Sequence, residues 1–210
     1  MNSCTTCKEA IEHCMSTHTF AFAHLYGDEK IMDMHIHNCC EVYYSISGGK
    51  QFLIDHCLYD IRPGDLFLIN QFESHHLTQI DQQTHERIIL SIDPEYLSKL
   101  STGATDLGHC FSFRDTRMPH QIHLSPKEQN RFMYFIHELH DDGGMGEDLL
   151  DQAIFLELMV FLNRAFAARC TDAAAPAPAP SSNYHAQVDA ILSYINSHIG
   201  EPLTLAGLSA

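Results

Sequence analysis

The sequence predicts a mainly β fold, an antiparallel jelly-roll barrel, followed by C-terminal helices. Between about residues 20 and 92, short apolar segments with period-two alternation follow one another closely, and no helical pattern separates them. The breaks contain turn-forming residues, such as the RPGD stretch at residues 62–65. Helical spacing of apolar residues dominates only after residue 120. Many short strands in succession are typical of an antiparallel sandwich or jelly roll.

The acidic composition limits the partners that the chain can bind by itself. Among 210 residues, 12 Lys and Arg stand against 27 Asp and Glu, which gives a formal net charge of -15. Duplex DNA and anionic membranes repel such a surface, so nucleic-acid binding by this chain alone is disfavoured. A hydrophobic fraction of 45% is enough for a sizeable core.

The N-terminal segment, residues 1–16, is expected to be a partly helical or flexible arm. It is too polar for a secretory signal, and no run of about 18 apolar residues occurs, so we expect a cytoplasmic protein with reduced thiols. Cys4 and Cys7 form a CxxC pair, with Cys14 nearby. This pair could hold zinc, but a second well-spaced pair is missing, and a loose arm is the simpler interpretation.

Residues 17–119 are expected to form the barrel. Alternation begins in the stretch FAFAHLY and continues through short segments up to residue 92, after which a short helix is expected at residues 94–100. The expected strands are 20–26, 31–37, 41–46, 50–54, 58–61, 66–69, 76–80 and 86–92.

Four polar side chains of this region have the spacing of a metal site. His35 and His37 are two residues apart, and Glu41 follows four residues later. Side chains two apart in a strand share a face, so these three can converge inside a barrel, where a neighbouring strand supplies His75. Three imidazoles and one carboxylate suit Zn, Ni, Fe or Mn without choosing among them. The alternative is a polar lining without a metal.

Other residues of these strands are candidates for binding a small molecule. By parity Tyr43 shares the face of Glu41, and Phe22, His24 and Gln79 are assigned to the same interior. Ligand pockets are mostly apolar with a few convergent polar groups. Plain core packing is the alternative for these side chains.

Two helices are expected within residues 120–170. Ser125, Pro126 and Glu128 have the pattern of a helix start, with Ser125 as N-cap and Glu128 completing a capping box. A second helix, at about residues 147–169, is apolar over more of its circumference than one contact face needs. We therefore expect it to pack on the barrel with one side and to form a homodimer with another.

The C-terminal part is expected to be a linker followed by the beginning of another domain. Residues 171–183 contain an Ala-Pro tract that is stiff, extended and unable to bury a core. An amphipathic helix is expected at residues 187–199, and the EPLTL sequence that follows can begin a further helix. Residues 184–210 therefore look like the start of a domain that stops at Ala210.

The metal-site spacing resembles the first motif of the cupin superfamily. The pattern His35-x-His37-x3-Glu41-x6-Gly48 fits that motif from its first histidine to its last glycine. The glycine usual before the first histidine is replaced by Glu29.

The second cupin motif is degraded. Gly64 is in place and His75 keeps the ligand position, whereas Asn70 and Phe72 stand where Pro and Gly are usual. These departures affect the shape of the loop more than the position of the ligand.

The order of segments resembles the AraC-type family of bacterial transcription regulators. The stretch IRPGDLFLINQFESHHL is similar to a hairpin of that family's N-terminal barrel, and YINSHIGEPLTLAGLSA is similar to the entry of its helix-turn-helix domain. The resemblance implies a cupin-like domain that senses a small-molecule effector and dimerises. It also implies that DNA is bound only through a complete C-terminal domain, since residues 171–210 contain no Lys or Arg.

The resemblance thus favours an effector-sensing and dimerisation part of a regulator, without catalytic residues. The rival hypothesis is a stand-alone metal-dependent cupin enzyme, an oxygenase or isomerase, because a 3-His-1-Glu site can run such chemistry. The linker and the second domain argue against it, since an enzyme needs neither.

Overall fold

The computed structural model describes residues 3–27, 34–49, 51–79, 85–112, 120–139 and 144–171. The predicted linker and C-terminal domain, apart from Thr171, lie outside this part. The strands are β1 (Ser3–Cys4), β2 (Phe20–Gly27), β3 (Cys40–Ser45), β4 (Gln51–Ile54), β5 (Cys57–Asp60), β6 (Asp65–Ile69), β7 (His75–Gln79), β8 (His85–Ile92) and β9 (Gln121–His123). The helices are α1 (Cys7–Thr17), α2 (Pro94–Leu100), α3 (His109–Ser112), α4 (Pro126–Glu138) and α5 (Glu147–Thr171).

The described strands form two sheets. The large sheet has the order β1-β2-β8-β3-β6-β9, and the small sheet has the order β5-β4-β7. All pairs are antiparallel except β1 with β2. The prediction of a mainly antiparallel β fold followed by helices is confirmed, in an arrangement of two sheets consistent with a jelly roll.

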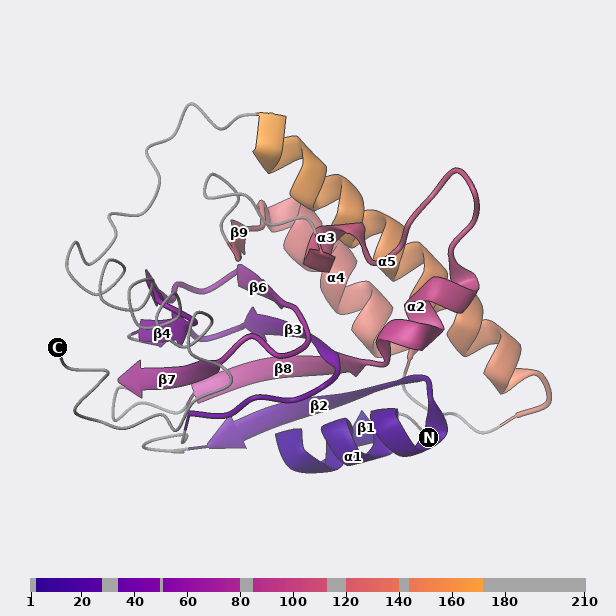
Figure 1. Cartoon of the computed structure of the whole chain (residues 1–210), viewed down its shortest axis with the longest axis horizontal. Helices are drawn as coiled ribbons and strands as arrows, with labels where there is room; N and C mark the ends of the chain where they lie inside the picture. Colours follow the sequence, from indigo (N-terminus) through magenta and orange to yellow (C-terminus); the bar gives the residue numbers. More distant parts are fainter. Residues whose placement is uncertain are drawn as a thin grey trace, which may run out of the picture.

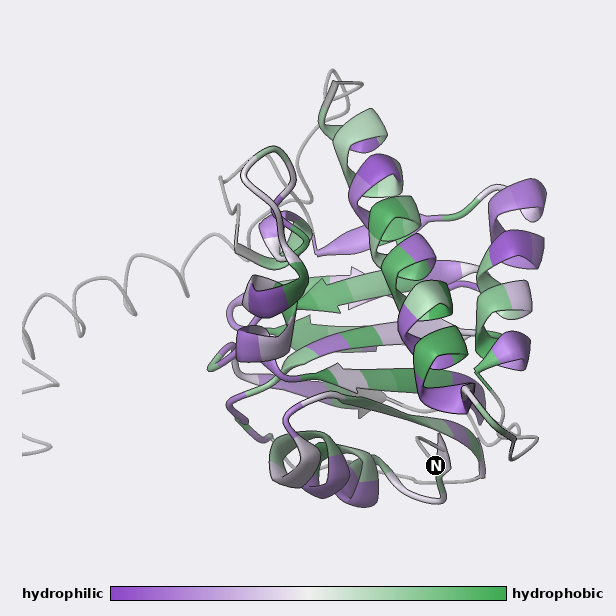
Figure 2. Cartoon of the chain, turned by 90° about the vertical axis from the view of Figure 1, so that its right-hand side faces the viewer, coloured by the Kyte–Doolittle hydropathy of each residue, from purple (hydrophilic) through white to green (hydrophobic). Residues whose placement is uncertain are grey.

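The large sheet is covered on both faces. Helices α2 to α5 lie on one face, whereas α1 lies on the opposite side, beneath β2 (Figure 1). Every residue of β3 is buried, as expected for a central strand between two cores. Figure 2 shows both apolar and polar residues along α5, of which Leu158 and Leu162 are buried whereas Leu149 and Leu150 are exposed.

The side chains of the large sheet alternate between its two faces, and cross-strand neighbours share a face. Val42 is opposite Leu90 and belongs to the helix-side core, together with Phe22. Tyr43 is opposite Ile89 and belongs to the other core, which the small sheet and α1 complete. Strand parity therefore separates the helix side from the sandwich side.

The expected helix start at Ser125 is confirmed. The side chain of Ser125 accepts a hydrogen bond from the backbone N–H of Glu128, and the Glu128 carboxylate accepts one from the backbone N–H of Ser125. The expected second helix corresponds to α5, and the short expected helix at residues 94–100 is α2, capped by Asp93. No helix of the described segments is long and apolar enough to cross a membrane.

The N-terminal arm is an ordered helix, and it packs more tightly than a loose arm would. Thr6 caps α1, whose side chains Ala10 and Cys14 are completely buried in the sandwich-side core. Cys4 and Cys7 belong to none of the groups that could hold a metal in the described part of the chain. The small residues Ala21 and Ala23 of β2 leave room for α1 to lie on the sheet.

The expected strand at residues 31–37 is represented within the described residues by a single bridge. His35 pairs with His75, and the chain joins the large sheet only at Cys40. The segment therefore passes from the edge of the small sheet to the centre of the large one. This crossing, not a continuous strand, brings the candidate metal ligands together.

An ion pair between α4 and α5 gives a stability prediction. The Arg169 guanidinium donates to both carboxylate oxygens of Glu128, at 2.8 and 2.7 Å. We expect Arg169→Ala to lower the free energy of unfolding by about 1 kcal/mol, because the pair is bidentate but partly exposed. Urea denaturation measures this value. Arg164→Ala, an exposed position of the same helix, should change it less.

The effect should depend on pH. Hydrogen bonds from Arg169 lower the pKa of Glu128 from 4.5 to about 2. A group with a depressed pKa in the folded state stabilises the fold above its unfolded-state value and loses that effect as the pH falls toward its folded-state value. The difference between wild type and Arg169→Ala should therefore shrink from pH 4.5 downward and vanish near pH 2. An unchanged difference at about pH 2.5 would contradict this assignment.

Candidate metal centre

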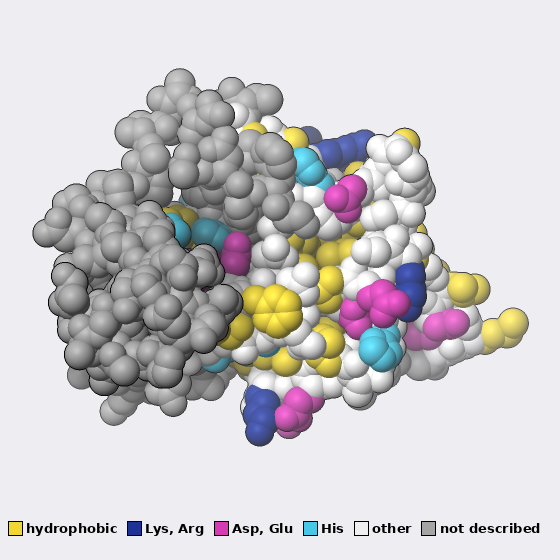
Figure 3. Space-filling model, viewed as in Figure 1, with side chains coloured by type: hydrophobic (Ala, Val, Ile, Leu, Met, Phe, Trp, Pro, Cys, Tyr) yellow, Lys and Arg dark blue, Asp and Glu magenta, His cyan; other side chains and the backbone are white. Residues whose placement is uncertain are grey.

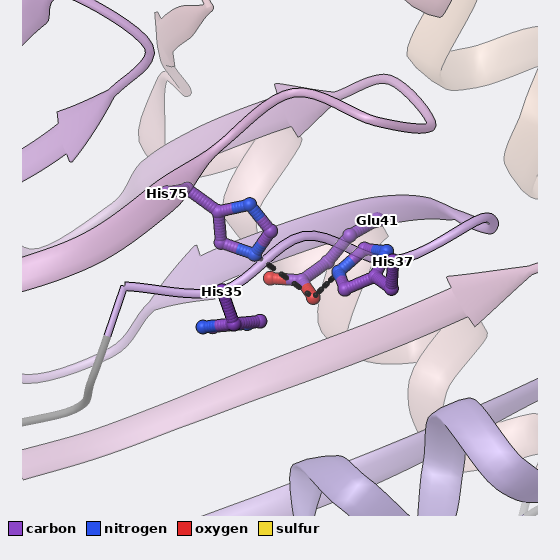
Figure 4. A group of neighbouring side chains, drawn as sticks. All are labelled: His35, His37, Glu41 and His75. Atoms are coloured by element: carbon purple, nitrogen blue, oxygen red, sulfur yellow. Dashed lines mark hydrogen bonds and ion pairs between the residues drawn. The ribbon is translucent and has the colours of Figure 1, made fainter. Parts of the chain in front are cut away.

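Four side chains converge between the two sheets. His35, His37, Glu41 and His75 each offer a ligand atom, and these atoms all lie within 4.8 Å of one another. Figure 4 shows the imidazoles gathered around the Glu41 carboxylate. The expected metal set is thus assembled at one place.

Backbone pairing fixes the first contact of the cluster. The N–H of His35 donates to the carbonyl of His75 at 3.2 Å, and the N–H of His75 donates to the carbonyl of His35 at 3.1 Å. In antiparallel pairing, residues directly opposite each other project to the same face. Their imidazole centroids consequently lie 4.2 Å apart.

Two imidazoles are oriented through the ring nitrogen away from the centre. Nδ1 of His37 lies 3.0 Å from the carbonyl oxygen of Cys39, and Nδ1 of His75 lies 2.9 Å from that of Glu73. A carbonyl can only accept, so each Nδ1 carries the hydrogen. In a neutral ring this leaves the lone pair on Nε2, and such outer hydrogen bonds are typical of metal-binding histidines.

The Glu41 carboxylate lies at the centre and is almost completely buried, with 1% exposure. Its Oε2 is 3.1 Å from Nε2 of His37 and 3.8 Å from Nε2 of His75. Burial opposes ionisation, but the two histidines outweigh it and hold the pKa of Glu41 far below its ordinary value. The carboxylate is therefore an anion that requires a positive partner.

The pKa values of His37 and His75 shift in the opposite direction, upward. Burial disfavours the charged form of His37, yet the hydrogen bonds with Cys39 and Glu41 raise its pKa to about 10. The pKa of His75 is also raised, by Glu41 and Glu73 against the effect of burial. Protons compensate the carboxylate here, in the position where a metal cation would otherwise do so.

The residues fit a divalent transition metal. Nε2 of His75 is buried and makes no hydrogen bond among the described residues, and its ion-pair partner, the Glu41 carboxylate, is 3.8 Å away. A buried polar atom without a hydrogen bond is costly, and coordination of a metal ion between His75 and Glu41 would remove that cost. Three imidazoles and one carboxylate are a donor set that first-row divalent ions accept.

A thiol contact links the cluster to α1. Cys39 Sγ lies 3.3 Å from Nδ1 of His37. A hydrogen bond with Cys14 of α1, together with burial, raises the pKa of Cys39. The thiol therefore stays neutral and serves as packing between His37 and α1, not as a thiolate ligand.

The predicted pocket residues do not all share one face. Tyr43 is on the sandwich side with Glu41, as expected, but it packs against Phe52 and Phe67. Phe22 is in the helix-side core, so its assignment to the face of Glu41 is wrong. Both faces of β2 are apolar, and alternation alone could not tell them apart.

The two other predicted pocket residues are His24 and Gln79. His24 has the strand parity of Phe22, and its Nε2 is 2.9 Å from a carboxylate oxygen of Glu86. The expectation that it lies inside with Tyr43 is therefore wrong as well. Gln79 ends β7, but its side chain lies outside the described residues.

His85 is a buried polar residue that sequence reasoning missed. It donates from Nδ1 to the carbonyl of Gly48 and bonds through Nε2 with the hydroxyl of Tyr43. A carbonyl oxygen only accepts, so Nδ1 carries the hydrogen. Its position at the start of β8, opposite Gly27, carries no motif, so no spacing in the sequence identifies it.

Two hollows open on the surface away from the cluster. One, of about 670 Å³, lies along α4 and α5 and includes Arg131 and Arg164. The other, of about 480 Å³, is lined by residues of β5, β6 and β9, including Tyr59 and Asp65. Neither includes a residue of the candidate metal set.

Comparisons with solved structures give distant likenesses. Apo ToxT from Vibrio cholerae is 10% identical, with a TM-score of 0.49, covering 90% of this chain and 69% of that one. Oxalate decarboxylase OxdC of Bacillus subtilis is 21% identical, with a TM-score of 0.33, covering 36% of this chain. An RmlC-like cupin from Shewanella frigidimarina is 17% identical, with a TM-score of 0.33. The alignment covers 36% of this chain and 68% of the cupin. These values are too low to carry an argument about function.

The family assignment rests on the sequence match. This chain spans only 21% of the oxalate decarboxylase chain, and no curated protein matches it. Residues 19–159, more than half of the chain, match the family described as the AraC-like ligand binding domain. The match includes both sheets from β2 onward, the whole candidate metal set and the first half of α5. The chain therefore belongs to the AraC-like ligand-binding domain family.

Proposed function

We propose that the chain is the effector-sensing and dimerisation part of an AraC-type transcription regulator, and that its sensing site holds a divalent transition metal ion. The observation that carries the proposal is the convergence of three histidines and a buried carboxylate inside a family ligand-binding domain. A net charge of -15 disfavours DNA contact through the acidic surface of the sensing domain itself.

The metal ligands in this proposal are His35, His37, Glu41 and His75. The ion would supply a cation at the buried carboxylate and would join the edge of the small sheet to β3. Zn, Ni, Fe and Mn all accept this donor set. The sensed effector is then the ion itself or a small molecule with an oxygen donor bound beside it, with Tyr43 and Gln79 as further candidates.

The proposed dimer surface is at the beginning of α5. Later residues of this helix, such as Leu158 and Leu162, are buried in the domain, so that face is occupied. Leu149 and Leu150, at 66% and 65% exposure, stay outside, next to Met145. Hydrophobic side chains project at the right-hand edge of Figure 3, where α5 begins. Neighbouring exposed apolar residues of this kind favour a contact between copies of the chain.

The sheet provides a route between the two sites. Glu41 projects from β3 into the sandwich, while its neighbour Val42 packs into the helix-side core. That core also contains Leu158 of α5. Effector binding that favours one packing of β3 would shift the population of positions that α5 adopts. A shift of α5 would in turn change the relative position of the DNA-binding domains.

A metal-dependent oxygenase or isomerase is the second candidate. The same donor set favours it, since an ion with open coordination positions can bind and polarise a substrate. The match to a ligand-binding domain family favours the sensor over the enzyme. Oxygen uptake or product formation by the metal-loaded protein with phenolic or sugar substrates, lost in His37→Ala, would support the enzyme.

The metal proposal predicts the metal content of variants. The protein, exposed to Zn, Ni, Fe and Mn salts and then desalted, is assayed by elemental analysis. His37→Ala and His75→Ala should each carry about one equivalent less than wild type, because each removes an imidazole from a four-ligand site. His137→Ala, which removes an exposed histidine of α4, should match wild type. Equal content in wild type and His37→Ala would overturn the proposal.

The dimer proposal predicts the mass in solution. Leu149→Lys combined with Leu150→Lys places two charges in the proposed contact and should convert a dimer to a monomer. Light scattering at tens of micromolar protein measures this. Leu58→Lys, which changes an exposed leucine of β5, is the matched control and should stay dimeric. A strictly monomeric wild type would exclude the contact.

A further inference from the structure

A second group of possible ligands lies at another place between the sheets. Asp55, in the turn between β4 and β5, Glu73, in the loop before β7, and His120, just before β9, present ligand atoms within 4.8 Å of one another. They come from three separate segments, and none belongs to the first cluster. No cupin-motif position contributes to this group.

His120 is the residue that points to a ligand. It is 8% exposed, and its Nε2 has no hydrogen-bond partner in the described part of the chain. This nitrogen nevertheless lies 3.3 Å from a carboxylate oxygen of Glu73. A buried nitrogen beside a carboxylate, without a hydrogen bond, needs a proton or a metal ion between the two groups.

The surroundings of His120 fix the ring as a metal ligand requires. Its Nδ1 lies 2.9 Å from the Tyr59 hydroxyl, which also accepts the backbone N–H of His120 at 3.4 Å. When Nδ1 donates to that oxygen, the lone pair of the neutral ring is on Nε2 and faces Glu73. Metal-binding histidines are commonly held by such a hydrogen bond on the far nitrogen.

Both carboxylates are held in place by backbone donors. Glu73 accepts the N–H of Asn70 at 2.6 Å, and Asp55 accepts the N–H of Ser74 at 2.9 Å. An ionised carboxylate has about four lone-pair sites, so these bonds leave capacity for a cation. A strongly acidic chain adds a general attraction for cations.

We propose that Asp55, Glu73 and His120 bind a second divalent metal ion. Two carboxylates and one imidazole suit Mn²⁺, Fe²⁺ or Zn²⁺. The ion joins the small sheet, through Asp55, to the edge of the large sheet, where the carbonyl of His120 accepts the N–H of Leu68 in β6. Because the carbonyl of Glu73 also accepts the Nδ1 hydrogen of His75, occupancy of this site orders a ligand of the first one.

Titration with Mn²⁺ tests the second site. The full chain is freed of metal with a chelator, and bound Mn²⁺ is measured from the loss of the free-ion signal in electron paramagnetic resonance. His120→Gln and Asp55→Asn should each bind one equivalent less than wild type. His37→Ala should still bind the one equivalent of Mn²⁺ that is lost in His120→Gln. The result for the second site therefore does not depend on whether the first site binds a metal ion. His137→Gln, at an exposed histidine, controls for surface binding.

The alternative is a plain ion pair between His120 and Glu73. In that case His120→Gln and Asp55→Asn bind as much Mn²⁺ as wild type, and the proposal is overturned. Asp55→Asn keeps the shape and the acceptor oxygen that holds Ser74, so it remains a test even where His120→Gln fails to fold. Circular dichroism of each variant verifies folding. Hyperfine coupling of the bound Mn²⁺ to an imidazole nitrogen, absent in His120→Gln, supports the assignment independently.

Discussion

The buried carboxylate of Glu41 is the constraint on which the arrangement of the two sheets depends. An uncompensated carboxylate in the interior costs several kcal/mol, on the order expected for a buried ion. His37 and His75 supply the compensation, and His75 belongs to the small sheet while Glu41 belongs to the large one. The sheets are therefore held together at this corner by electrostatics as well as by apolar packing, and the identity of the compensating cation can alter how they meet.

Because β3 lies at the centre of the large sheet, a displacement of its backbone at Glu41 also displaces side chains on the opposite face. Its side chains alternate between the sandwich and the helices, and all of them are buried. A close-packed core transmits displacement because it has little free volume. Val42 and Tyr44 of this strand contact the core that α4 and α5 complete, so the candidate sensor and the candidate dimer surface share one element.

The parts that the sequence predicted well are those with a local physical signal. The capping box at Ser125 and the spacing from His35 to Glu41 are local, and each is found where expected. The assignment of Phe22 failed because β2 is apolar on both faces, a result of helices on one side and α1 on the other. His85 and His120 carry no motif, since their roles arise from partners on distant strands that spacing cannot reveal.

Both histidine clusters bridge the same pair of sheets, and this shared geometry bears on what the domain detects. Glu73 participates in each: its carbonyl orients His75, and its carboxylate faces His120. A cation in either place reduces the freedom of the loop before β7, and by linkage ordering of that loop favours a cation in the other. The coupling runs through one residue of one loop, so filling of one site would favour filling of the other. The domain would then respond to the concentration of available metal ions. This arrangement suits a metal sensor better than a catalyst.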